Sequence, residues 1–327
     1  MKEHVETFIN KLEEGIAIGQ KAVIRKHSSE IRNIVIAGLG GSGIGGTIAA
    51  AVLDEDLKVP VTVVKDYFLP AFVNEHTLLL ACSYSGNTEE TIQTFFSAQK
   101  SGAKIICITS GGKLLELARE NDCDAIIIPG GMPPRACFPY SFTQLFYALH
   151  ALDLIDSKII RQLELTVGFL KAEEQNIKTE AHQMAVNLSG KLPVIYSEAK
   201  FEGVCIRFRQ QLNENSKILC WHAALPEMNH NELVGLVEPD QRLAFIFVRN
   251  ATDYNRTQRR MEIVKNVAAN VSPLVFEIWS KGETLLERVF YHILMGDWIS
   301  VYIAQIKQID ATEVRVIDFL KKELAGM

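Results

Sequence analysis

The chain has 327 residues, of which 48% are hydrophobic and 22% charged, a balance typical of a globular protein long enough for two domains of ordinary size. Its formal net charge of −5 at pH 7 argues against a nucleic acid or an anionic membrane surface as a partner. The N-terminus alternates in charge, unlike a signal peptide, and no apolar stretch approaches the roughly 20 residues that a membrane-spanning helix needs.

Short β-branched runs alternate with helical patterns through the first half of the chain. Strands are predicted at residues 31–37, 59–64, 78–82, 104–109 and 124–128. Helices are predicted between them at 43–53, 89–101 and 114–121, followed by a closing helix at 141–152. This alternation indicates a mainly parallel sheet that helices cover on both faces.

The second half repeats the pattern less regularly. Strands are predicted at 193–196, 217–221, 243–248 and 273–277, and helices at 161–187, 202–214, 255–269, 285–305 and 312–323. The thirty residues before Ile31 are expected to form one polar helix. We therefore predict an α/β protein of two doubly wound domains, residues 1–153 and 154–327, each a mainly parallel sheet flanked by helices.

A hydroxyl-rich turn, CSYSGNTEET at residues 82–91, lies where a predicted strand ends and a helix begins. Ligands bind at such positions in open α/β sheets, and the unpaired N–H groups of a helix's first turn favour an anion. Ser83, Ser85 and Thr88 add neutral donors, and Gly86 lets the backbone close on a ligand. No lysine or arginine lies in the turn, so it suits a single phosphate group on a small molecule. The alternative, a capping box of Asn87 with Glu90, leaves two of the hydroxyls unexplained.

Upstream, the glycines of GLGGSG at residues 38–43 follow a strand and match the dinucleotide fingerprint. An NAD site also needs an acidic residue about 20 residues on, whereas Asp66 lies 28 residues after Gly38 (66 − 38 = 28), beside Lys65. Gly41 and Ser42 fit a turn in which backbone and a hydroxyl approach a small sugar. Dinucleotide binding, sugar binding and tight packing all stay open for this turn.

Arg135 ends the segment GGMPPR, whose glycines and prolines fix the shape of a loop. A fixed guanidinium suits the stabilisation of a developing oxyanion. The alternative is a surface arginine on a proline-rich turn.

Glu214 lies at the end of a predicted helix, between two asparagines. A carboxylate there faces the negative end of the helix dipole, which is unfavourable for a structural residue but useful for a general base. The alternative is a solvent-exposed glutamate.

His230 lies between two asparagines in a polar turn, and we expect hydrogen bonds from them to orient its ring for proton shuttling. The alternatives are a structural loop histidine or a metal site with His222 and Glu227. Neither H-x-H nor H-E-x-x-H spacing is present to favour metal.

The run SYSGNTEET, with the glycine turn before it, resembles the sugar isomerase (SIS) family of phosphosugar-binding domains. The segments N-E-N at 213–215 and N-H-N-E at 229–232, with I-x-x-L-K-x-x-L at 317–324, narrow the resemblance to bifunctional phosphoglucose/phosphomannose isomerases. The resemblance runs from about Ile31 to the C-terminus. It implies that Gly41 and Ser42 line the sugar and that Arg135 lies beside the substrate.

The same resemblance makes Glu214 the proton-transfer base and places His230 in the active site of the neighbouring subunit of a homodimer. Lys321 would reach the active site, with Lys322 as the alternative if the pattern slips by one residue. From the residues alone, a solvated lysine pair on a terminal helix is the plainer interpretation.

These interpretations together predict an aldose–ketose isomerase that interconverts glucose 6-phosphate, mannose 6-phosphate or both with fructose 6-phosphate through an enediolate. The phosphate group is expected to bind Ser83, Ser85, Asn87 and Thr88. Ring opening is expected to use His230 and Lys321. No metal or nucleotide cofactor is required. The alternative is a non-catalytic phosphosugar-binding regulator, which would need neither Glu214 nor His230.

The six cysteines have no C-x-x-C pairing, and several lie in apolar, strand-like runs. We therefore expect reduced core thiols and a cytoplasmic protein. The predicted reaction belongs to glycolysis and gluconeogenesis. Whether both sugar epimers are substrates depends on the space at C2, which the sequence does not reveal.

Overall fold

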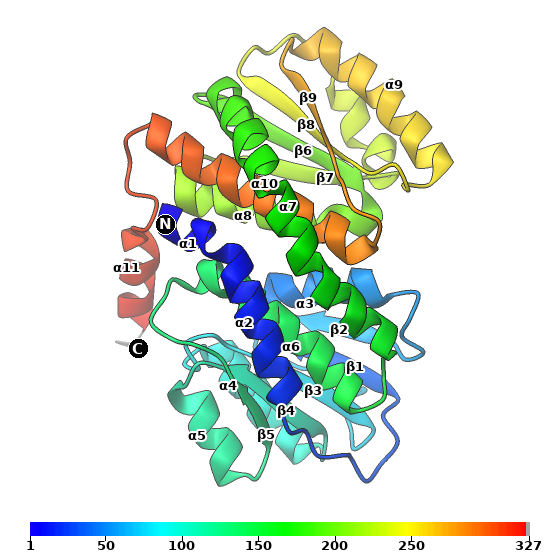
Figure 1. Ribbon diagram of the computed structural model, residues 1–327, viewed down its shortest axis with the longest axis vertical. Coiled ribbons are helices and arrows are strands. Elements are labelled where there is room, and N and C mark those ends of the chain that lie inside the picture. The colour runs from blue at the N-terminus through cyan, green and yellow to red at the C-terminus, as the bar shows by residue number, and fades with distance from the viewer. Residues whose placement is uncertain (325–327) are drawn as a thin grey trace. The chain divides into compact units, whose positions relative to one another are not determined.

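The computed structural model describes residues 1–324, which form two compact units. The first-sheet unit comprises Glu6–Glu174 and Lys281–Tyr291, and the second-sheet unit comprises Met1–Val5, Gln175–Ser280 and residues 292–324. Each unit contains one sheet with helices on both of its faces (Figure 1). The α/β class and the two parallel sheets are as predicted. The domain boundary at residue 153 stays a prediction.

The first sheet has the order β2-β1-β3-β4-β5, and every neighbouring pair is parallel. Its strands are β1 (Asn33–Ala37), β2 (Val61–Val64), β3 (Thr77–Cys82), β4 (Lys104–Thr109) and β5 (Asp124–Ile127). Ala37 at the end of β1 pairs with both Val64 and Ala81, so the carboxyl ends of the central strands meet at one edge. The chain order reverses between β1 and β3, where ligands bind in such sheets.

Helices cover this sheet because its strands are apolar on both faces. Side chains of α4 (Glu89–Lys100) and α5 (Gly112–Glu120) pack with Val35, Leu79 and Cys107 on one face. The other face meets α3 (Gly40–Leu53), where a Cβ at Gly46 would lie 2.7 Å from Cγ2 of Ile36. Helix α6 (Phe138–Ala151) packs beside α3 and carries α2 (Phe8–Lys21) on its outer side.

The second sheet has the order β7-β6-β8-β9 and is also parallel throughout. Its strands are β6 (Leu192–Glu198), β7 (Trp221–Leu225), β8 (Leu243–Arg249) and β9 (Val275–Trp279). Helix α9 (Asn255–Val271) covers one face, and α8 (Glu202–Ser216) packs against β6 and β7. The remaining helices are α1 (Lys2–Glu6), α7 (Ser157–Leu188), α10 (Leu285–Ile306) and α11 (Arg315–Leu324).

Two local predictions were wrong. The strand expected at 217–221 begins only at Trp221, because α8 continues to Ser216 and Lys217 ends it in a left-handed conformation with φ 53°. The first thirty residues contain two helices rather than one polar helix. The second of these, α2, buries Phe8 and Leu12 and is therefore amphipathic.

Helix α10 contradicts the expectation that no apolar stretch approaches the length of a membrane-spanning helix. Among residues 1–324 it is the one helix long and apolar enough to cross a membrane by those measures, with a mean hydropathy of 1.2 over its best window. Of that window, 83% is buried inside the protein. A buried core helix passes the same test of length and composition as a membrane span.

A polar ladder joins α8 to α10 within the second-sheet unit. The buried Arg207 donates to Oδ2 of Asp297 at 2.6 Å, and Nε2 of Gln211 donates to Oδ1 of the same carboxylate at 2.7 Å. One turn further on, Nδ2 of Asn215 donates to Oγ of Ser300 at 2.9 Å. Positions 207, 211 and 215 are four residues apart, so they share one face of the helix. The ladder fixes the end of α8.

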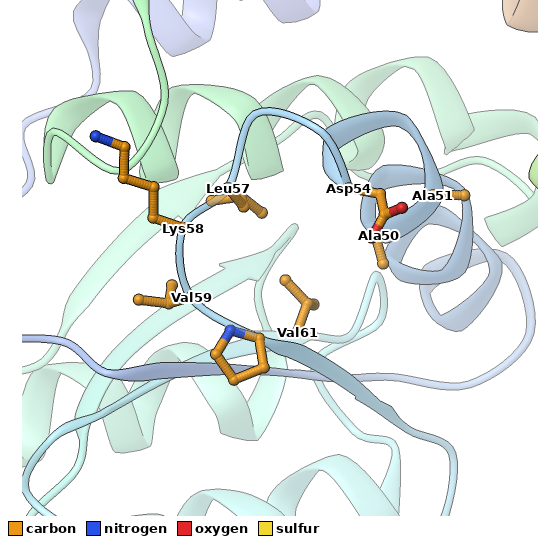
Figure 2. Close-up of a pocket in the computed structure, with 8 residues that line it drawn as sticks. Ala50, Ala51, Asp54, Leu57, Lys58, Val59 and Val61 are labelled. Carbon is orange, nitrogen blue, oxygen red and sulfur yellow. The ribbon is translucent and has the colours of Figure 1, made fainter.

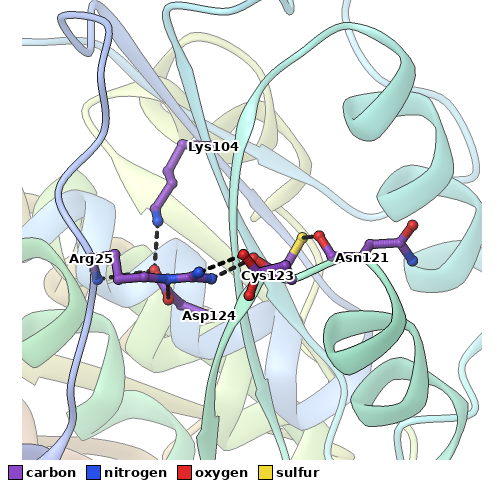
Figure 3. Close-up of polar contacts among 6 residues, drawn as sticks. Arg25, Lys104, Asn121, Cys123 and Asp124 are labelled. Atoms are coloured by element: carbon purple, nitrogen blue, oxygen red, sulfur yellow. Dashed lines mark hydrogen bonds and ion pairs between the residues drawn. The ribbon is translucent and has the colours of Figure 1, made fainter.

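Arg25 ties the segment after α2 to the amino ends of β4 and β5 (Figure 3). Its Nε donates to Oδ1 of Asp124 at 2.7 Å and its Nη1 to Oδ2 of Asp122 at 2.8 Å, while Lys104 donates to Asp124 from the other side. Burial alone would raise the pKa of Asp124, but the hydrogen bonds from Lys104 and Arg25 outweigh it and lower that pKa below its usual value.

We predict that Asp124→Asn lowers the free energy of unfolding by about 2 kcal/mol at pH 7, because a carboxylate with two cationic partners is lost from a buried site. Since the folded-state pKa is lowered, this contribution is complete above the ordinary aspartate pKa and is lost as the pH falls below about 4. Denaturant unfolding at pH 7 and pH 3 measures the difference. Asp122→Asn, at the exposed partner of Arg25, is the matched control with little effect. Equal destabilisation of the Asp124 variant at both pH values would contradict the prediction.

Candidate functional site

The carboxyl end of β3 continues into the turn of residues 83–88, which leads into α4. Oγ of Ser83 lies 2.8 Å from Oγ1 of Thr88 and accepts a hydrogen bond from the N–H of Gly86 at 3.1 Å. Oγ of Ser85 accepts from the N–H of Asn87 at 3.2 Å. The hydroxyls therefore gather at the start of α4, where the first backbone N–H groups lack intrahelical partners. This arrangement can receive an anion.

The turn is braced by a second glycine turn at the end of β4. Gly86 has φ 71°, and a Cβ there would lie 1.8 Å from the carbonyl oxygen of Gly111. A Cβ at Gly112, with φ 67°, would lie 2.4 Å from the carbonyl oxygen of Ser85. The N–H of Leu114 also donates to the carbonyl of Gly86 at 2.8 Å. Sequence reasoning missed Gly111 and Gly112, although a Gly-Gly pair between a predicted strand and helix is a usable signal.

Asn87 does not form the capping box considered above. The N-cap of α4 is Thr88, whose side chain makes no capping hydrogen bond. Oδ1 of Asn87 instead accepts from the N–H of Lys113 at 3.0 Å, at the start of α5. Asn87 thus binds the neighbouring helix, and its assignment to the substrate stays a prediction.

The glycine turn of residues 38–43 has two kinds of glycine. Packing requires Gly38 and Gly43, because a Cβ at Gly43 would lie 2.3 Å from the carbonyl oxygen of Gly38 and one at Gly38 would lie 2.7 Å from that of Cys82. Gly40 has φ 52° and nothing near its missing Cβ, so its backbone conformation is the reason for glycine. Helix α3 begins there, three residues earlier than predicted.

Arg135 lies beside this glycine turn, within the same unit. It is 5% exposed and belongs to the 3₁₀ turn η1 (Pro134–Cys137). A Cβ at Gly41 would lie 3.3 Å from the carbonyl oxygen of Pro134 and 3.5 Å from Cα of Arg135. The first-sheet unit therefore brings together the hydroxyl turn, the predicted sugar turn with Ser42 and the predicted oxyanion-stabilising arginine. The interpretation of Arg135 as an exposed surface residue is wrong.

The matching edge of the second sheet is filled by the protein's own carboxylates. After β8, both Oδ atoms of Asp253 accept hydrogen bonds from Asn250, from its backbone N–H and its side chain, each at 3.0 Å. The N–H of Tyr254, which precedes α9, donates to Oε1 of Glu198 at 3.0 Å. Burial, reinforced by the facing Glu198, raises the pKa of Asp253 well above its usual range. Carboxylates here occupy the place that an anionic ligand would need.

Glu214 lies in the last turn of α8, as predicted, and is partly buried rather than solvent-exposed. The two asparagines beside it hold the helix end: Asn215 through Ser300, as described, and Asn213 by donating to the carbonyl of Ile218 at 2.8 Å. Nζ of Lys307 donates to the carbonyl of Ser216 at 2.7 Å. The backbone that carries Glu214 is therefore fixed on both sides of the residue.

His230 ends the 3₁₀ turn η3 (Glu227–His230), and its side chain is exposed. The neighbouring asparagines do not orient the ring as expected. Nδ2 of Asn231 donates to Oε1 of Glu227 at 2.9 Å, and Oδ1 of Asn229 accepts from Arg260 at 3.2 Å. They shape the turn and leave the imidazole pointing outward from it.

The loop of His230 is anchored by Glu232, which sequence reasoning did not single out. Its Oε1 accepts hydrogen bonds from the hydroxyl of Tyr196 at 2.6 Å and from Nε1 of Trp221 at 2.9 Å.

The metal site considered for His222 and Glu227 gains no support. Nε2 of His222 lies 3.8 Å from Oε1 of Glu202, and burial lowers the pKa of His222, which favours a neutral ring. Within residues 1–324, no cluster of three or more His, Cys, Asp or Glu side chains is placed to hold a metal ion.

Lys321 and Lys322 are both exposed on α11, in which no residue is buried. The choice between them stays a prediction. All six cysteines are free, and four of them are buried, as expected of core thiols.

A cavity of about 420 Å³ lies elsewhere in the first-sheet unit, between the end of α3 and the start of β2 (Figure 2). Asp54 and Lys58 are its charged side chains, and Ala51, Leu57 and Val61 are among the apolar ones. Because it lies at the amino end of β2, it is remote from the carboxyl ends of the strands that carry the hydroxyl turn. None of the predicted site residues lines it.

Comparison with solved structures agrees with the fold. The chain superposes on the C-terminal domain of glucosamine-fructose-6-phosphate aminotransferase from Francisella tularensis with a TM-score of 0.75 at 17% identity, covering 95% of this chain and 98% of that chain. Glucosamine-6-phosphate deaminase from Thermotoga maritima gives a TM-score of 0.70 at 14% identity, covering 95% of both chains. At such identities the likeness concerns the fold alone.

Sequence comparison is more specific. Residues 29–152 match the family model of the SIS domain, and residues 177–324 match that of the bacterial phospho-glucose isomerase C-terminal SIS domain. The bifunctional phosphoglucose/phosphomannose isomerase of Caldicellulosiruptor bescii is 38% identical over 99% of both chains. That of Aquifex aeolicus is 34% identical over 98% of this chain and 97% of its own. D-glucosamine-6-phosphate 4-epimerase from Sulfolobus acidocaldarius is 30% identical over 88% of both chains.

The matches cover both sheets and the motifs at 83–91, 213–215 and 229–232. The chain belongs to the bifunctional phosphoglucose/phosphomannose isomerase family of SIS-domain proteins.

Proposed function

We propose that this protein is an aldose–ketose isomerase that interconverts glucose 6-phosphate and mannose 6-phosphate with fructose 6-phosphate. The observation that carries the proposal is the braced hydroxyl turn of residues 83–88 at the start of α4, with the Arg135 turn packed against Gly41. Membership of the isomerase family and the named activity of its relatives support the reaction class.

Substrate binding begins with the phosphate group. The hydroxyls of Ser83, Ser85 and Thr88 donate to its oxygens, together with backbone N–H groups at the start of α4. No lysine or arginine lies in the turn, so neutral donors and the positive end of the α4 dipole hold a single phosphate group. The sugar then extends toward Gly41 and Ser42.

After ring opening, Glu214 takes the proton from C2 of the aldose and returns it to C1, while the hydroxyl proton moves from O2 to O1, which yields the ketose. The negative charge that develops on the C1–C2 oxygens is stabilised by the guanidinium of Arg135. His230 and Lys321 exchange the protons of ring opening and closure. Glucose and mannose 6-phosphates differ only at C2, so removal of the C2 proton gives both epimers the same enediolate.

A non-catalytic regulator is the less favoured alternative. It has no use for a partly buried carboxylate on a helix end that a polar ladder fixes, or for an exposed histidine on an anchored loop. The relative named as a 4-epimerase makes direct assay of each hexose 6-phosphate the first measurement. Interconversion of neither aldose with fructose 6-phosphate would overturn the proposed function.

We further propose a homodimer in which His230 serves the partner's active site. Its loop follows β7, which is the edge strand of its sheet. Exposed apolar side chains flank β7 and its loop along the chain: Leu219 is 80% exposed, Val234 77% and Val237 68%. Apolar side chains gathered beside a free sheet edge support contact with a second copy. A two-fold dimer presents the same surface from both chains.

We also propose that the protein works in the cytoplasm, in the sugar phosphate steps shared by glycolysis and gluconeogenesis. The six free cysteines support a reducing compartment.

Removal of hydroxyls from the turn of residues 83–88, here called the phosphate turn, is expected to weaken substrate binding. Thr88→Val and the double variant Ser83→Ala/Thr88→Val should raise KM by about 5- to 150-fold per lost hydrogen bond, since a bond to a charged group contributes about 1–3 kcal/mol. Steady-state kinetics with fructose 6-phosphate measure the effect. Ser97→Ala, at a partly exposed position of the same helix, is the control. An unchanged KM in the double variant would remove the turn from phosphate binding.

Glu214→Gln is expected to keep the fold and substrate binding while kcat falls by about three orders of magnitude or more, because an amide cannot accept the proton. Substrate binding by calorimetry and turnover by coupled assay separate the two effects. Glu202→Gln, in the first turn of the same helix, should retain near-normal turnover. More than about a tenth of the original kcat in Glu214→Gln would exclude it as the base.

The dimer proposal predicts complementation. Subunits with His230→Ala and subunits with Glu214→Gln should each be inactive alone. After random exchange, about half of the dimers are mixed, and each mixed dimer has one intact site, so about a quarter of the original activity should return. Size-exclusion chromatography and differently tagged subunits verify exchange. Exchange without any recovery of activity would place His230 in the site of its own chain.

A further inference from the structure

We propose that Tyr84 is a positioning residue that couples the phosphate turn to Arg135. The proposal rests on the function proposed above and assigns a task to the one aromatic residue inside the hydroxyl turn. Tyr84 stands between Ser83 and Ser85 and is only 8% exposed. Its ring therefore points into the protein from the turn that receives the phosphate group.

The hydroxyl of Tyr84 contacts the loop that leads to Arg135. The N–H of Met132 donates to this hydroxyl at 3.1 Å, across 48 residues of sequence. The thiol of Cys137 faces the same hydroxyl from the other side of Arg135. Met132 lies three residues before the arginine and Cys137 two residues after it, so the hydroxyl holds the backbone before the arginine and faces a side chain after it. The Cys137 thiol also donates to the carbonyl of Pro133 at 3.5 Å, which ties it to the same loop.

The main chain of Tyr84 is fixed as well. Its carbonyl oxygen accepts hydrogen bonds from the N–H of Ser110 at 3.0 Å and from Oγ of Ser110 at 2.7 Å. A Cβ at Gly130 would lie 3.4 Å from Ser110, so Ser110 also lies against the start of residues 130–137, the arginine loop. Tyr84 and Ser110 together form a continuous contact from the phosphate turn to residues 130–137.

This connection has a consequence for catalysis. The guanidinium must be placed where charge develops on the substrate, and small displacements of such groups lower turnover strongly. Binding of the phosphate group adds contacts to the already braced turn of residues 83–88, and Tyr84 transmits the added stability to the arginine loop. The hydroxyl itself acts only through Arg135 and takes no part in proton transfer. Burial raises the pKa of Tyr84, which keeps this hydroxyl protonated at neutral pH.

Tyr84→Phe removes the hydroxyl and keeps the ring that packs in the core. We expect kcat to fall about tenfold with KM nearly unchanged, because the phosphate donors stay in place. In an Arg135→Ala background the same substitution should have no further effect on kcat, since the group that it positions is gone. Tyr147→Phe is the matched control: its partly buried hydroxyl contacts Glu164, away from the arginine loop, and kcat should not change.

Hydrogen exchange supplies a readout that does not depend on activity. The amides of residues 130–137 should exchange faster in Tyr84→Phe than in the original protein and at the original rate in Tyr147→Phe. Added inorganic phosphate should slow this exchange in the original protein but not in Tyr84→Phe. Unchanged exchange and kcat in Tyr84→Phe, or a full additional loss in the Arg135→Ala background, would overturn the proposal. If the original protein isomerises no hexose 6-phosphate, the proposed function fails, and the exchange data still decide the coupling.

Discussion

The contact of two backbone turns at the carboxyl edge of the first sheet is the constraint on which the candidate site depends. The turn after β3 and the turn after β4 approach so closely that no side chain fits between them at Gly86 or Gly112. Their conformations also have positive φ, so the two requirements coincide at the same positions. With the turns interlocked, Ser83 and Thr88 are held at the start of α4 before any ligand arrives. Preorganised donors of this kind lose little entropy on binding.

A second constraint acts on the helix that carries Glu214. The end of a helix is ordinarily the part most prone to fraying, yet α8 is fixed to α10 by Arg207, Gln211 and Asn215. The pair of Arg207 with Asp297 is almost fully buried, and such pairs contribute more to a unique arrangement than to net stability. Loss of the ladder would release the carboxylate from a defined position. Polar contacts fix this helix end because hydrogen bonds and ion pairs restrict distance and direction, whereas the hydrophobic effect is not directional.

The two sheets have the same strand arrangement at their centres but different chemistry at their edges. In the first, the turn after the third strand along the chain carries hydroxyls and glycines. In the second, Asp253 accepts hydrogen bonds from Asn250 within the turn after β8, and Glu198 at the end of β6 accepts from the N–H of Tyr254 at the start of α9. Carboxylates at a helix start are favourable for the same reason that a phosphate group would be, since both meet the positive end of the dipole. Glu198 therefore takes the place at this helix start that an external anion would need.

By itself, the sequence determined the strands of the first sheet, three of the four strands of the second, and the residue types of the turn at 83–88. Those features follow from local periodicity and from residue types that lie next to each other, such as Ser85, Gly86 and Asn87. The family resemblance added the proposed roles of Arg135, Glu214 and His230, whose plainer interpretations the residues alone could not dismiss. The residue pattern had already placed Glu214 at the end of its helix, and the structure has it in the last turn.

Only the tertiary structure decided which distant groups meet. Tyr84 and Met132 are 48 residues apart, and Arg207 and Asp297 are 90 apart, so no local pattern could pair them. The left-handed end of α8 at Lys217, where a strand had been expected, depends on the carbonyls that its own and neighbouring side chains satisfy. Contacts of this kind are set by the packing of whole elements, whereas a sequence pattern reports only which face of each element is apolar.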